Sequence, residues 1–249
     1  MLKNKFSYEK QCGISVIIPV NNEAENIDYL YESLSTELEK LRIGYELIFI
    51  DDFSSDNTKE VISALSARDR HICYCRLSER SGQTSAISKG FQMAKNDIII
   101  TMDGDLQCDP VYIKDMLAKL DEGFDAVLGW RVVRKDGAIV RISSCLGNSI
   151  VNLIFQTKFR DIATPYRVFK KNVFPVNYNL NRGYHRFLPL FFNKRCNFLE
   201  FPICFKKRYR GKSHYNISKL FNCLASIILL LISRHRQSRG GSLYFLHNG

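Results

Sequence analysis

Two carboxylates stand at a spacing that favours a metal site. Asp103 and Asp105 follow the apolar run DIIITM, at residues 97–102, and Gly104 between them leaves the backbone room to turn. Unneutralised, the two carboxylates would repel one another and raise each other's pKa. A hard cation relieves this repulsion, and Mg²⁺ or Mn²⁺ typically binds one or two carboxylates together with substrate phosphates. The pattern predicts a divalent metal that neutralises charge developing on a leaving diphosphate.

A second acidic pair, Asp51 and Asp52, strengthens this interpretation. It also follows an apolar run, YELIFI at residues 45–50, and is followed by Ser54, Ser55 and Asp56. A lone Asp-x-Asp arises often by chance, and aspartates commonly form turns and cap helices. Two acidic strand ends in a chain with a net charge of +11 favour ligand binding over solvated turns.

The elements that must position these residues alternate along the N-terminal half. We expect strands at 14–20, 45–50, 72–77, 97–102 and 126–129, because these runs are apolar and rich in β-branched residues. Helical patterns lie between them, at 22–41, from Asp56–Thr58 to Ala67, at 82–94 and at 110–120. Strands separated by single helices predict a parallel sheet with helices on both faces. Ligands bind outside the carboxyl ends of such strands, where all four aspartates fall.

Composition narrows the class of partner. The chain has 249 residues, of which 45% are hydrophobic, as is typical of a globular protein. Its net charge of +11 indicates an anionic binding partner. The eight cysteines include no C-x-x-C pair, so a structural zinc site is not expected. Residues 1–11 are polar and charged, which does not fit a signal peptide, so we expect free thiols in a reducing cytosol.

Several motifs, in order and spacing, resemble a known family. They read ISVIIPVNNEAENI, ELIFIDDFSSDNT, GQTSAISKGFQMAKNDIIITMDGDLQCDP, GWR, DIATPYRVFKK, NRGYHRFLPLFF and FPICFKKRYRGKSHYNISKLFN. Together they resemble the family 2 glycosyltransferases with the GT-A fold, in the branch that includes dolichyl-phosphate mannosyltransferase and the bacterial polyprenyl-phosphate glycosyltransferases. The resemblance implies a Rossmann-like, mostly parallel sheet in a GT-A domain at 1–217, followed by an apolar and basic segment at 218–249 with a disordered tail.

The resemblance also implies a role for each residue of the site. Pro19, Asn22, Glu23 and Asp52 would hold the nucleoside of a UDP- or GDP-sugar, and Gln83 belongs to the same donor set. Asp103 would contact the ribose or the metal, Asp105 would ligate the metal, and Gln107 would join it. Arg131, Arg210 and Lys212 would bracket the phosphates, and His185 with Arg186 would lie near the acceptor. The family usually has glycine at the positions of Phe53 and Asn57, so Phe53 could reshape the nucleoside pocket.

The acceptor segment favours a phosphate over a hydroxyl acceptor. A hydroxyl needs a general base to take its proton, whereas a phosphate monoester arrives anionic. Residues 181–186 read NRGYHR, with cations and no acid. His185 could serve as a base because its reference pKa lies near neutrality, but a packing or hydrogen-bonding role is as consistent with the sequence. We expect attack by a polyprenyl phosphate on the anomeric carbon, with inversion and release of a nucleoside diphosphate.

The C-terminal part suggests a membrane surface. Residues 206–212 read KKRYRGK, and residues 220–233 form an apolar run of fourteen residues, too short to span a bilayer. Its cationic flanks predict a helix in the interface plane of an anionic membrane, with a core or partner-docking helix as the alternative. We therefore expect a peripheral protein on the cytoplasmic face, with a membrane partner or a homo-oligomer as further options and no nucleic acid.

Three other functions are weighed against this one. A nucleotidyltransferase would show a glycine-rich loop after the first strand, and residues 19–23 read PVNNE. A family 2 transferase with a sugar hydroxyl as acceptor is an alternative within the same family. A non-catalytic, truncated relative that binds nucleotide fits the lost glycines, but the retention of Asp52, Asp103, Asp105, Arg131 and Lys212 argues against it.

Overall fold

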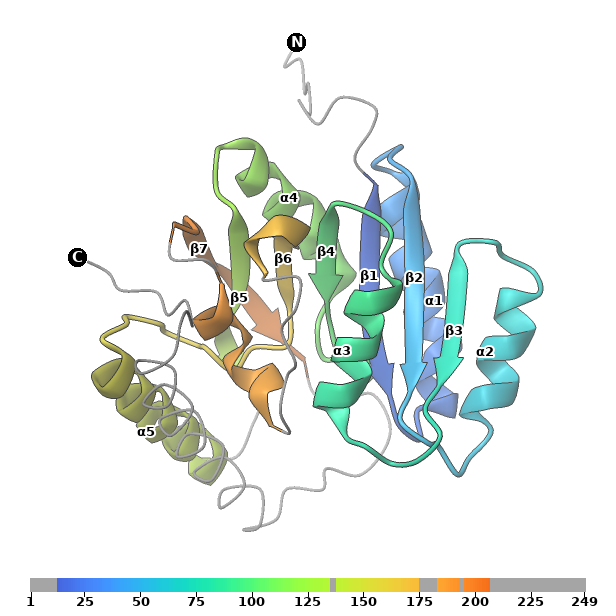
Figure 1. Ribbon diagram of the computed structural model, residues 1–249, viewed down its shortest axis with the longest axis horizontal. Helices are drawn as coiled ribbons and strands as arrows, with labels where there is room; N and C mark the ends of the chain where they lie inside the picture. The colour runs from blue at the N-terminus through green and yellow to red at the C-terminus, as the bar shows by residue number, and fades with distance from the viewer. Residues whose placement is uncertain (1–12, 135–137, 175–182, 193–194, 207–249) are drawn as a thin grey trace, which may run out of the picture.

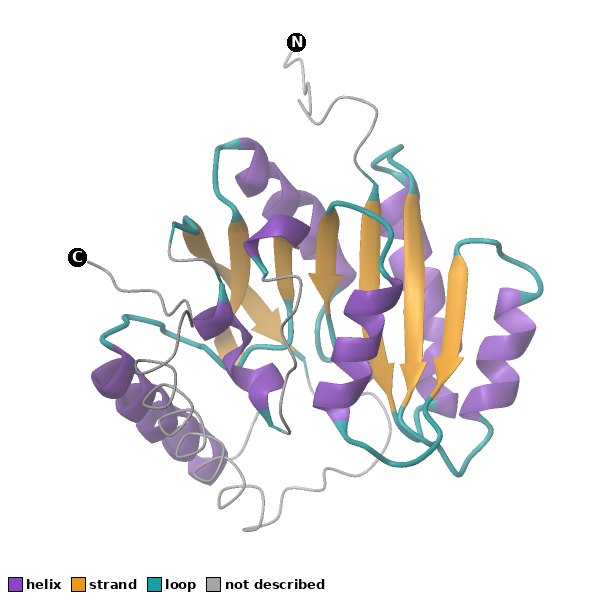
Figure 2. Cartoon of the chain, viewed as in Figure 1, coloured by secondary structure: helices purple, strands orange, loops and turns teal. Residues whose placement is uncertain are grey.

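The computed structural model describes residues 13–134, 138–174, 183–192 and 195–206 (Figure 1). A sheet of seven strands, in the order β3-β2-β1-β4-β6-β5-β7, forms the middle layer. Helices cover both of its faces, as the colouring by secondary structure makes plain (Figure 2). The expected α/β fold with a mostly parallel sheet is confirmed.

The bounds of the elements are as follows. The strands are β1 Ile14–Val20, β2 Tyr45–Asp51, β3 Ile72–Arg76, β4 Ile98–Thr101, β5 Ala126–Arg134, β6 Arg167–Lys170 and β7 Phe198–Phe205. The α-helices are α1 Ala24–Glu39, α2 Thr58–Ser66, α3 Gln83–Met93, α4 Ile113–Asp121 and α5 Ala138–Phe155. Three short 3₁₀ helices are η1 Pro110–Tyr112, η2 Lys171–Val173 and η3 Tyr184–Phe191.

The N-terminal half follows the expected pattern closely. Strand β1 pairs in parallel with β2 and β4, and β2 pairs in parallel with β3. Strands β1, β2 and β4 are largely apolar because both faces of the sheet are covered there, whereas the edge strand β3 is only partly buried. Most bounds differ from the expected ones by one or two residues; the larger differences are that the fifth strand continues beyond Gly129 to Arg134 and that the helix expected from Pro110 begins as the 3₁₀ turn η1. Strand β6 runs antiparallel to β4 and β5, while β7 is parallel to β5.

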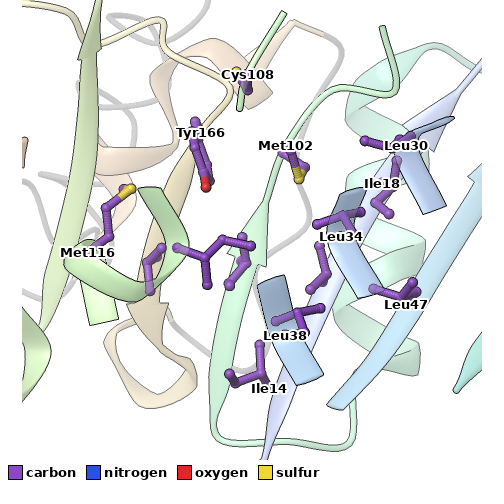
Figure 3. Packing of buried hydrophobic residues seen from close by; sticks show 14 of the residues in the cluster. Ile14, Ile18, Leu30, Leu34, Leu38, Leu47, Met102, Cys108, Met116 and Tyr166 are labelled. Atoms are coloured by element: carbon purple, nitrogen blue, oxygen red, sulfur yellow. The ribbon is translucent and has the colours of Figure 1, made fainter. Parts of the chain in front are cut away.

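Two apolar clusters, one on each face, hold the layers together. On one face, α1, α2 and α4 pack on the sheet, and Figure 3 shows part of this cluster. Helix α1 buries Ile27, Leu30, Leu34 and Leu38, which recur every three or four residues and so form one stripe. On the other face, α3, α5 and η3 pack on the sheet.

The register of the strands sets the position of the site. Val20, the last residue of β1, pairs with Asp51, the last residue of β2. Thr101, at the end of β4, pairs with Ile17 of β1. Because β6 runs in the opposite direction, its first residue, Arg167, lies at the same edge and pairs with Thr101. The carboxyl ends of β1, β2 and β4 therefore meet at one edge, here called the carboxyl edge.

Three further expectations concern the cysteines, the membrane and the C-terminal segment. The six cysteines of the described ranges are all free thiols. Within those ranges, no helix is both long and apolar enough to cross a bilayer. The apolar run at 220–233 and the division of the chain at residue 217 lie outside the described residues.

Candidate functional site

The two aspartates after β2 have different surroundings. Asp51 is fully buried and accepts hydrogen bonds from the Ser54 amide (2.8 Å), the Ser54 hydroxyl (2.5 Å) and the Tyr74 hydroxyl (3.0 Å). Burial, reinforced by this bond to Asp51, raises the pKa of Tyr74 well above its ordinary value. Asp51 therefore fixes the loop after β2.

Asp52 points instead toward the start of α3. Its Oδ1 accepts the amides of Ser81 (2.7 Å) and Gly82 (2.9 Å), and its own amide donates to the Val20 carbonyl at 2.9 Å. The Asn21 side chain donates to the Asp52 carbonyl at 2.8 Å. These bonds join the loops that follow β1, β2 and β3 at one residue, Asp52, which is only 6% exposed.

The residues expected to hold the nucleoside meet at this point. Pro19 lies in β1 opposite Ile50, and Asn22 connects the first two loops. The Asn22 Oδ1 accepts the Ser55 amide at 2.7 Å, and the Glu23 amide donates to the Thr58 hydroxyl at 3.0 Å. The polar groups of Asn22 and Glu23 thus hold the two loops together, and their contact with a nucleoside stays a prediction.

The Asp-Gly-Asp motif lies beside this loop pair. The Gln83 side-chain amide donates to Asp103 Oδ1 at 2.6 Å, and the Gln107 amide donates to Asp105 Oδ1 at 3.2 Å. The φ of Gly104 lies outside the left-handed region, and a Cβ there would stand 2.8 Å from Val20 Cγ1. The close approach of β1 therefore favours glycine at this position.

The donor set around the motif fits a hard divalent cation. Burial and then the negative charges of Asp103 and Asp105 raise the pKa of the Cys108 thiol well above its usual value. Gln107 uses its side-chain nitrogen on the Lys206 carbonyl at 3.1 Å, so its oxygen is the atom it could offer a cation. Within the described ranges, no cluster of three or more His, Cys, Asp or Glu side chains could hold a metal. Two carboxylates completed by substrate phosphates suit Mg²⁺ or Mn²⁺.

Backbone strain concentrates at the same edge. Asn22 (φ 58°), Phe53 (φ 60°) and Leu106 (φ 61°) adopt the left-handed region, and they lie in the loops after β1, β2 and β4 respectively. Asparagine tolerates this region, but phenylalanine and leucine adopt it at a cost. Such strain persists only where the surrounding structure imposes it, and it gathers at functional sites.

Arg131, expected to bracket the phosphates, is bound to a carboxylate. Its Nε and Nη2 donate to the two oxygens of Asp161, at 2.5 and 2.6 Å, in a pair that is almost buried. Asp161 is held in turn near Glu200, whose Oε1 accepts the Asp161 amide at 2.9 Å. Its role toward phosphate remains a prediction, and the partner Asp161 was not expected from the sequence.

A second arginine at this edge was missed altogether. Arg167 is 1% exposed; its Nη2 makes a long bond of 3.4 Å to the Ile162 carbonyl, and its Nε has no hydrogen-bond partner. Burial lowers its pKa to about 10, opposed by the nearby charges of Asp103 and Asp161. The sequence signal was the charged residue inside the apolar run YRVF.

His185 is anchored to α3. Its Nδ1 lies 2.8 Å from the Thr84 hydroxyl, which also accepts the Gly183 amide at 2.9 Å. Although the residue keeps some exposure, the packing around the ring lowers its pKa to about 3, and the charges of Arg186 and Arg167 act in the same direction. The imidazole is therefore neutral at physiological pH. Arg210 and Lys212, the other expected phosphate ligands, lie outside the described residues.

Known structures share this architecture. Glucosyl-3-phosphoglycerate synthase from Mycobacterium tuberculosis, in complex with phosphoglyceric acid, has a TM-score of 0.68 and 18% identity, over 90% of this chain and 80% of that chain. The complex of that enzyme with Mn²⁺, UDP-glucose and phosphoglyceric acid gives a TM-score of 0.69 and 17% identity, over 90% and 79%. A further mycobacterial protein gives 0.67 and 17%, over 90% and 74%.

The sequence itself gives the family. Residues 15–188, most of the chain, match the model of the family described as glycosyl transferase family 2. The matched range contains the four aspartates of the carboxyl edge, Arg131 and His185. The expected family is thereby confirmed, and the chain belongs to glycosyl transferase family 2.

Proposed function

We propose that this chain transfers a sugar from a UDP- or GDP-sugar to a polyprenyl phosphate, with inversion at the anomeric carbon and with Mg²⁺ or Mn²⁺. The observation that carries the proposal is that Asp52, Asp103 and Asp105 follow parallel strands to the carboxyl edge, where Asp52 accepts the Gly82 amide and Asp103 accepts the side-chain amide of the next residue, Gln83. Crystal structures of glucosyl-3-phosphoglycerate synthase contain Mn²⁺ and UDP-glucose on the same fold, which supports this donor and this metal.

Different residues of the carboxyl edge would bind different parts of the nucleotide-sugar. Asp52, with Pro19, Asn22 and Glu23 around it, would hold the nucleoside, and Asp103, oriented by Gln83, would meet the ribose or the metal. Asp105 and Gln107 would complete the metal site beside the diphosphate. When bound, the cation would neutralise the negative charge that develops on the departing nucleoside diphosphate.

The surroundings of His185 favour an acceptor that needs no base. An imidazole with a pKa of about 3 accepts a proton poorly at neutral pH, because its conjugate acid is too strong. The 3₁₀ helix that carries it, with the sequence YHRFLPLF, contains no carboxylate. In the proposed step, a phosphate oxygen of the acceptor bonds to the anomeric carbon while the bond from that carbon to the diphosphate breaks. No proton has to be moved.

An exposed apolar stripe on α5 supports binding to a membrane surface. Leu146, Ile150 and Leu153 of α5 are 60%, 37% and 82% exposed, and their spacing of four and three residues puts them on one side of the helix. A polyprenyl phosphate carries its phosphate at the membrane–water interface. The proposal therefore includes peripheral attachment to the cytoplasmic face of an anionic membrane. A membrane protein or a second copy of the chain would be its binding partner there.

A hydroxyl acceptor is the second candidate. Phosphoglyceric acid is bound in crystal structures of glucosyl-3-phosphoglycerate synthase, which has a similar fold. Such an acceptor would attack through a hydroxyl and would need a group to take its proton, for which His185 is poorly suited. A small anionic hydroxyl compound belongs in any test for this reason.

The test is a mass-spectrometric search for product. The purified chain is incubated with Mn²⁺, a panel of UDP- and GDP-sugars, and either a short polyprenyl phosphate or phosphoglyceric acid. A glycolipid formed from one donor only when metal is present would support the proposal. If product forms with phosphoglyceric acid and not with the polyprenyl phosphate, the proposed acceptor is wrong and a hydroxyl acceptor takes its place. Nucleotide binding without product from either acceptor would indicate a non-catalytic relative.

A further inference from the structure

Phe53 occupies an unusual place in the loop after β2. Its backbone has a φ of 60°, a conformation that phenylalanine adopts at a cost. Its neighbours Asp52 and Ser54 are 6% and 4% exposed, whereas Phe53 is 47% exposed. The strain is thus not offset by burying the ring in the core. A strained backbone conformation that leaves an apolar ring exposed to solvent indicates a functional role for the ring.

The loop that carries Phe53 is held from both sides. Ser54 donates its amide and its hydroxyl to the buried Asp51, at 2.8 and 2.5 Å, and Asn21 donates to the Asp52 carbonyl at 2.8 Å. These bonds fix the backbone before and after Phe53 and so set the direction in which its side chain leaves the loop. Pre-ordering of this kind lowers the entropy lost when a ligand binds.

Arg76 supports the ring from one side. Its guanidinium carbon lies 4.8 Å from the centroid of the Phe53 ring. The guanidinium is anchored by a 2.8 Å hydrogen bond to the Ser54 carbonyl, and its Nε lies 3.7 Å from Asp51 Oδ2. Because Arg76 covers one face, the exposed surface of the ring comes from the other face and the edge. A planar group could stack there.

We propose that Phe53, supported by Arg76, is the stacking platform for the base of the donor nucleotide. The inference rests on the proposed function, because it assigns a ligand to the residue next to Asp52. A purine or pyrimidine is the planar group that a nucleotide-sugar brings to this edge, and stacking on an aromatic side chain tolerates either base. Phe53 is then a binding residue for the donor base, and the choice between uracil and guanine is made elsewhere.

The test compares nucleotide binding in three variants of Phe53 and one control variant. Dissociation constants of UDP and of GDP are measured by calorimetry in Mg²⁺ for the wild type, Phe53→Leu, Phe53→Trp and Phe53→Gly. Phe53→Leu is expected to weaken both nucleotides about tenfold, and Phe53→Trp to retain binding. Phe53→Gly relieves the strained φ, so its unfolding midpoint should stay at or above that of the wild type while its binding weakens as in the leucine variant. Tyr29→Leu, a change at another exposed aromatic (48%), should leave binding unchanged.

A spectroscopic readout separates stacking from general damage to the loop. Base protons of UDP and GDP bound over an aromatic face shift upfield in the proton NMR spectrum, and this shift should disappear in Phe53→Leu. Unchanged affinity and an unchanged shift in Phe53→Leu would overturn this inference and leave the proposed function standing. A wild type that binds neither nucleotide would overturn both.

Discussion

The guanidinium of Arg131 and the carboxylate of Asp161 form a two-pronged ion pair between β5 and the segment before β6, with N–O distances of 2.5 and 2.6 Å. Their side chains are 10% and 5% exposed. The pair joins two parts of the chain that lie 30 residues apart, close to the buried Arg167.

Asp161→Asn should destabilise the chain, because it removes the charged partner of the nearly buried Arg131 guanidinium. Breaking one side of a buried pair costs about 3 kcal/mol, measured as the free energy of unfolding in urea. Asp125→Asn is the matched control, since the Asp125–Lys170 pair is 31% exposed on both sides and should cost about 1 kcal/mol or less. An equal loss of unfolding free energy in the two variants would contradict the larger contribution to stability expected of the buried Arg131–Asp161 pair.

Gly104→Ala should disturb the Asp-Gly-Asp loop by a steric clash with β1. The new methyl group would stand 2.8 Å from Val20 Cγ1, and overpacking of this kind costs about 1–3 kcal/mol. The change should lower the thermal unfolding midpoint. Adding Val20→Ala removes the clashing atom, so the double variant should lose less than the sum of the two single losses. Strictly additive losses would show that the contact does not explain the glycine.

The lowered pKa of His185 makes a prediction about pH. Between about pH 3, its pKa in the folded chain, and 6.5, its ordinary value, the unfolded chain binds a proton that the folded chain does not. The free energy of unfolding therefore falls as pH falls through this range. His185→Gln retains a hydrogen-bonding group for Thr84 but cannot titrate, so its stability should fall less between pH 7 and pH 4. Parallel pH curves for the two proteins would contradict the lowered pKa.

The exposed stripe on α5 can be tested apart from catalysis. Leu146→Gln combined with Leu153→Gln should reduce sedimentation with vesicles of phosphatidylcholine and phosphatidylglycerol. Both side chains are more than half exposed, so the urea midpoint should not change. Val111→Gln, at an exposed apolar position in η1 (50%), is the control. Vesicle binding equal to that of the wild type would remove α5 from the membrane proposal.

The N-terminal half could be predicted because burial decides its structure. Strands such as Ile14–Val20 are covered on both faces, so they read as unbroken apolar runs, and the helices between them show one apolar stripe. The C-terminal strands lack that signal. Strand β6 has four residues, of which Arg167 is a buried charge, and the edge strand β7 contains Glu200 and Pro202.

The site was predictable to the same extent. Aspartates at strand ends converge because the carboxyl ends of parallel strands share one edge, so Asp52, Asp103 and Asp105 could be placed from spacing alone. The partner of Arg131 could not, since Asp161 follows it by 30 residues and lies in the irregular segment between α5 and β6. The need for Gly104 likewise depends on Val20, far away in the chain.

The most direct test of the donor site is sugar transfer by Asp105→Asn. Asparagine keeps an oxygen for the Gln107 amide but loses the charge that would bind the metal. Product formation from the preferred nucleotide-sugar in Mn²⁺ is measured by mass spectrometry for the wild type, Asp105→Asn and the surface control Asp115→Asn. We expect product from the wild type and from Asp115→Asn, its loss on chelation of the metal, and at least a hundredfold lower rate (about 3 kcal/mol of transition-state stabilisation) for Asp105→Asn. Full, metal-dependent turnover by Asp105→Asn would contradict the assignment of this edge as the metal and donor site.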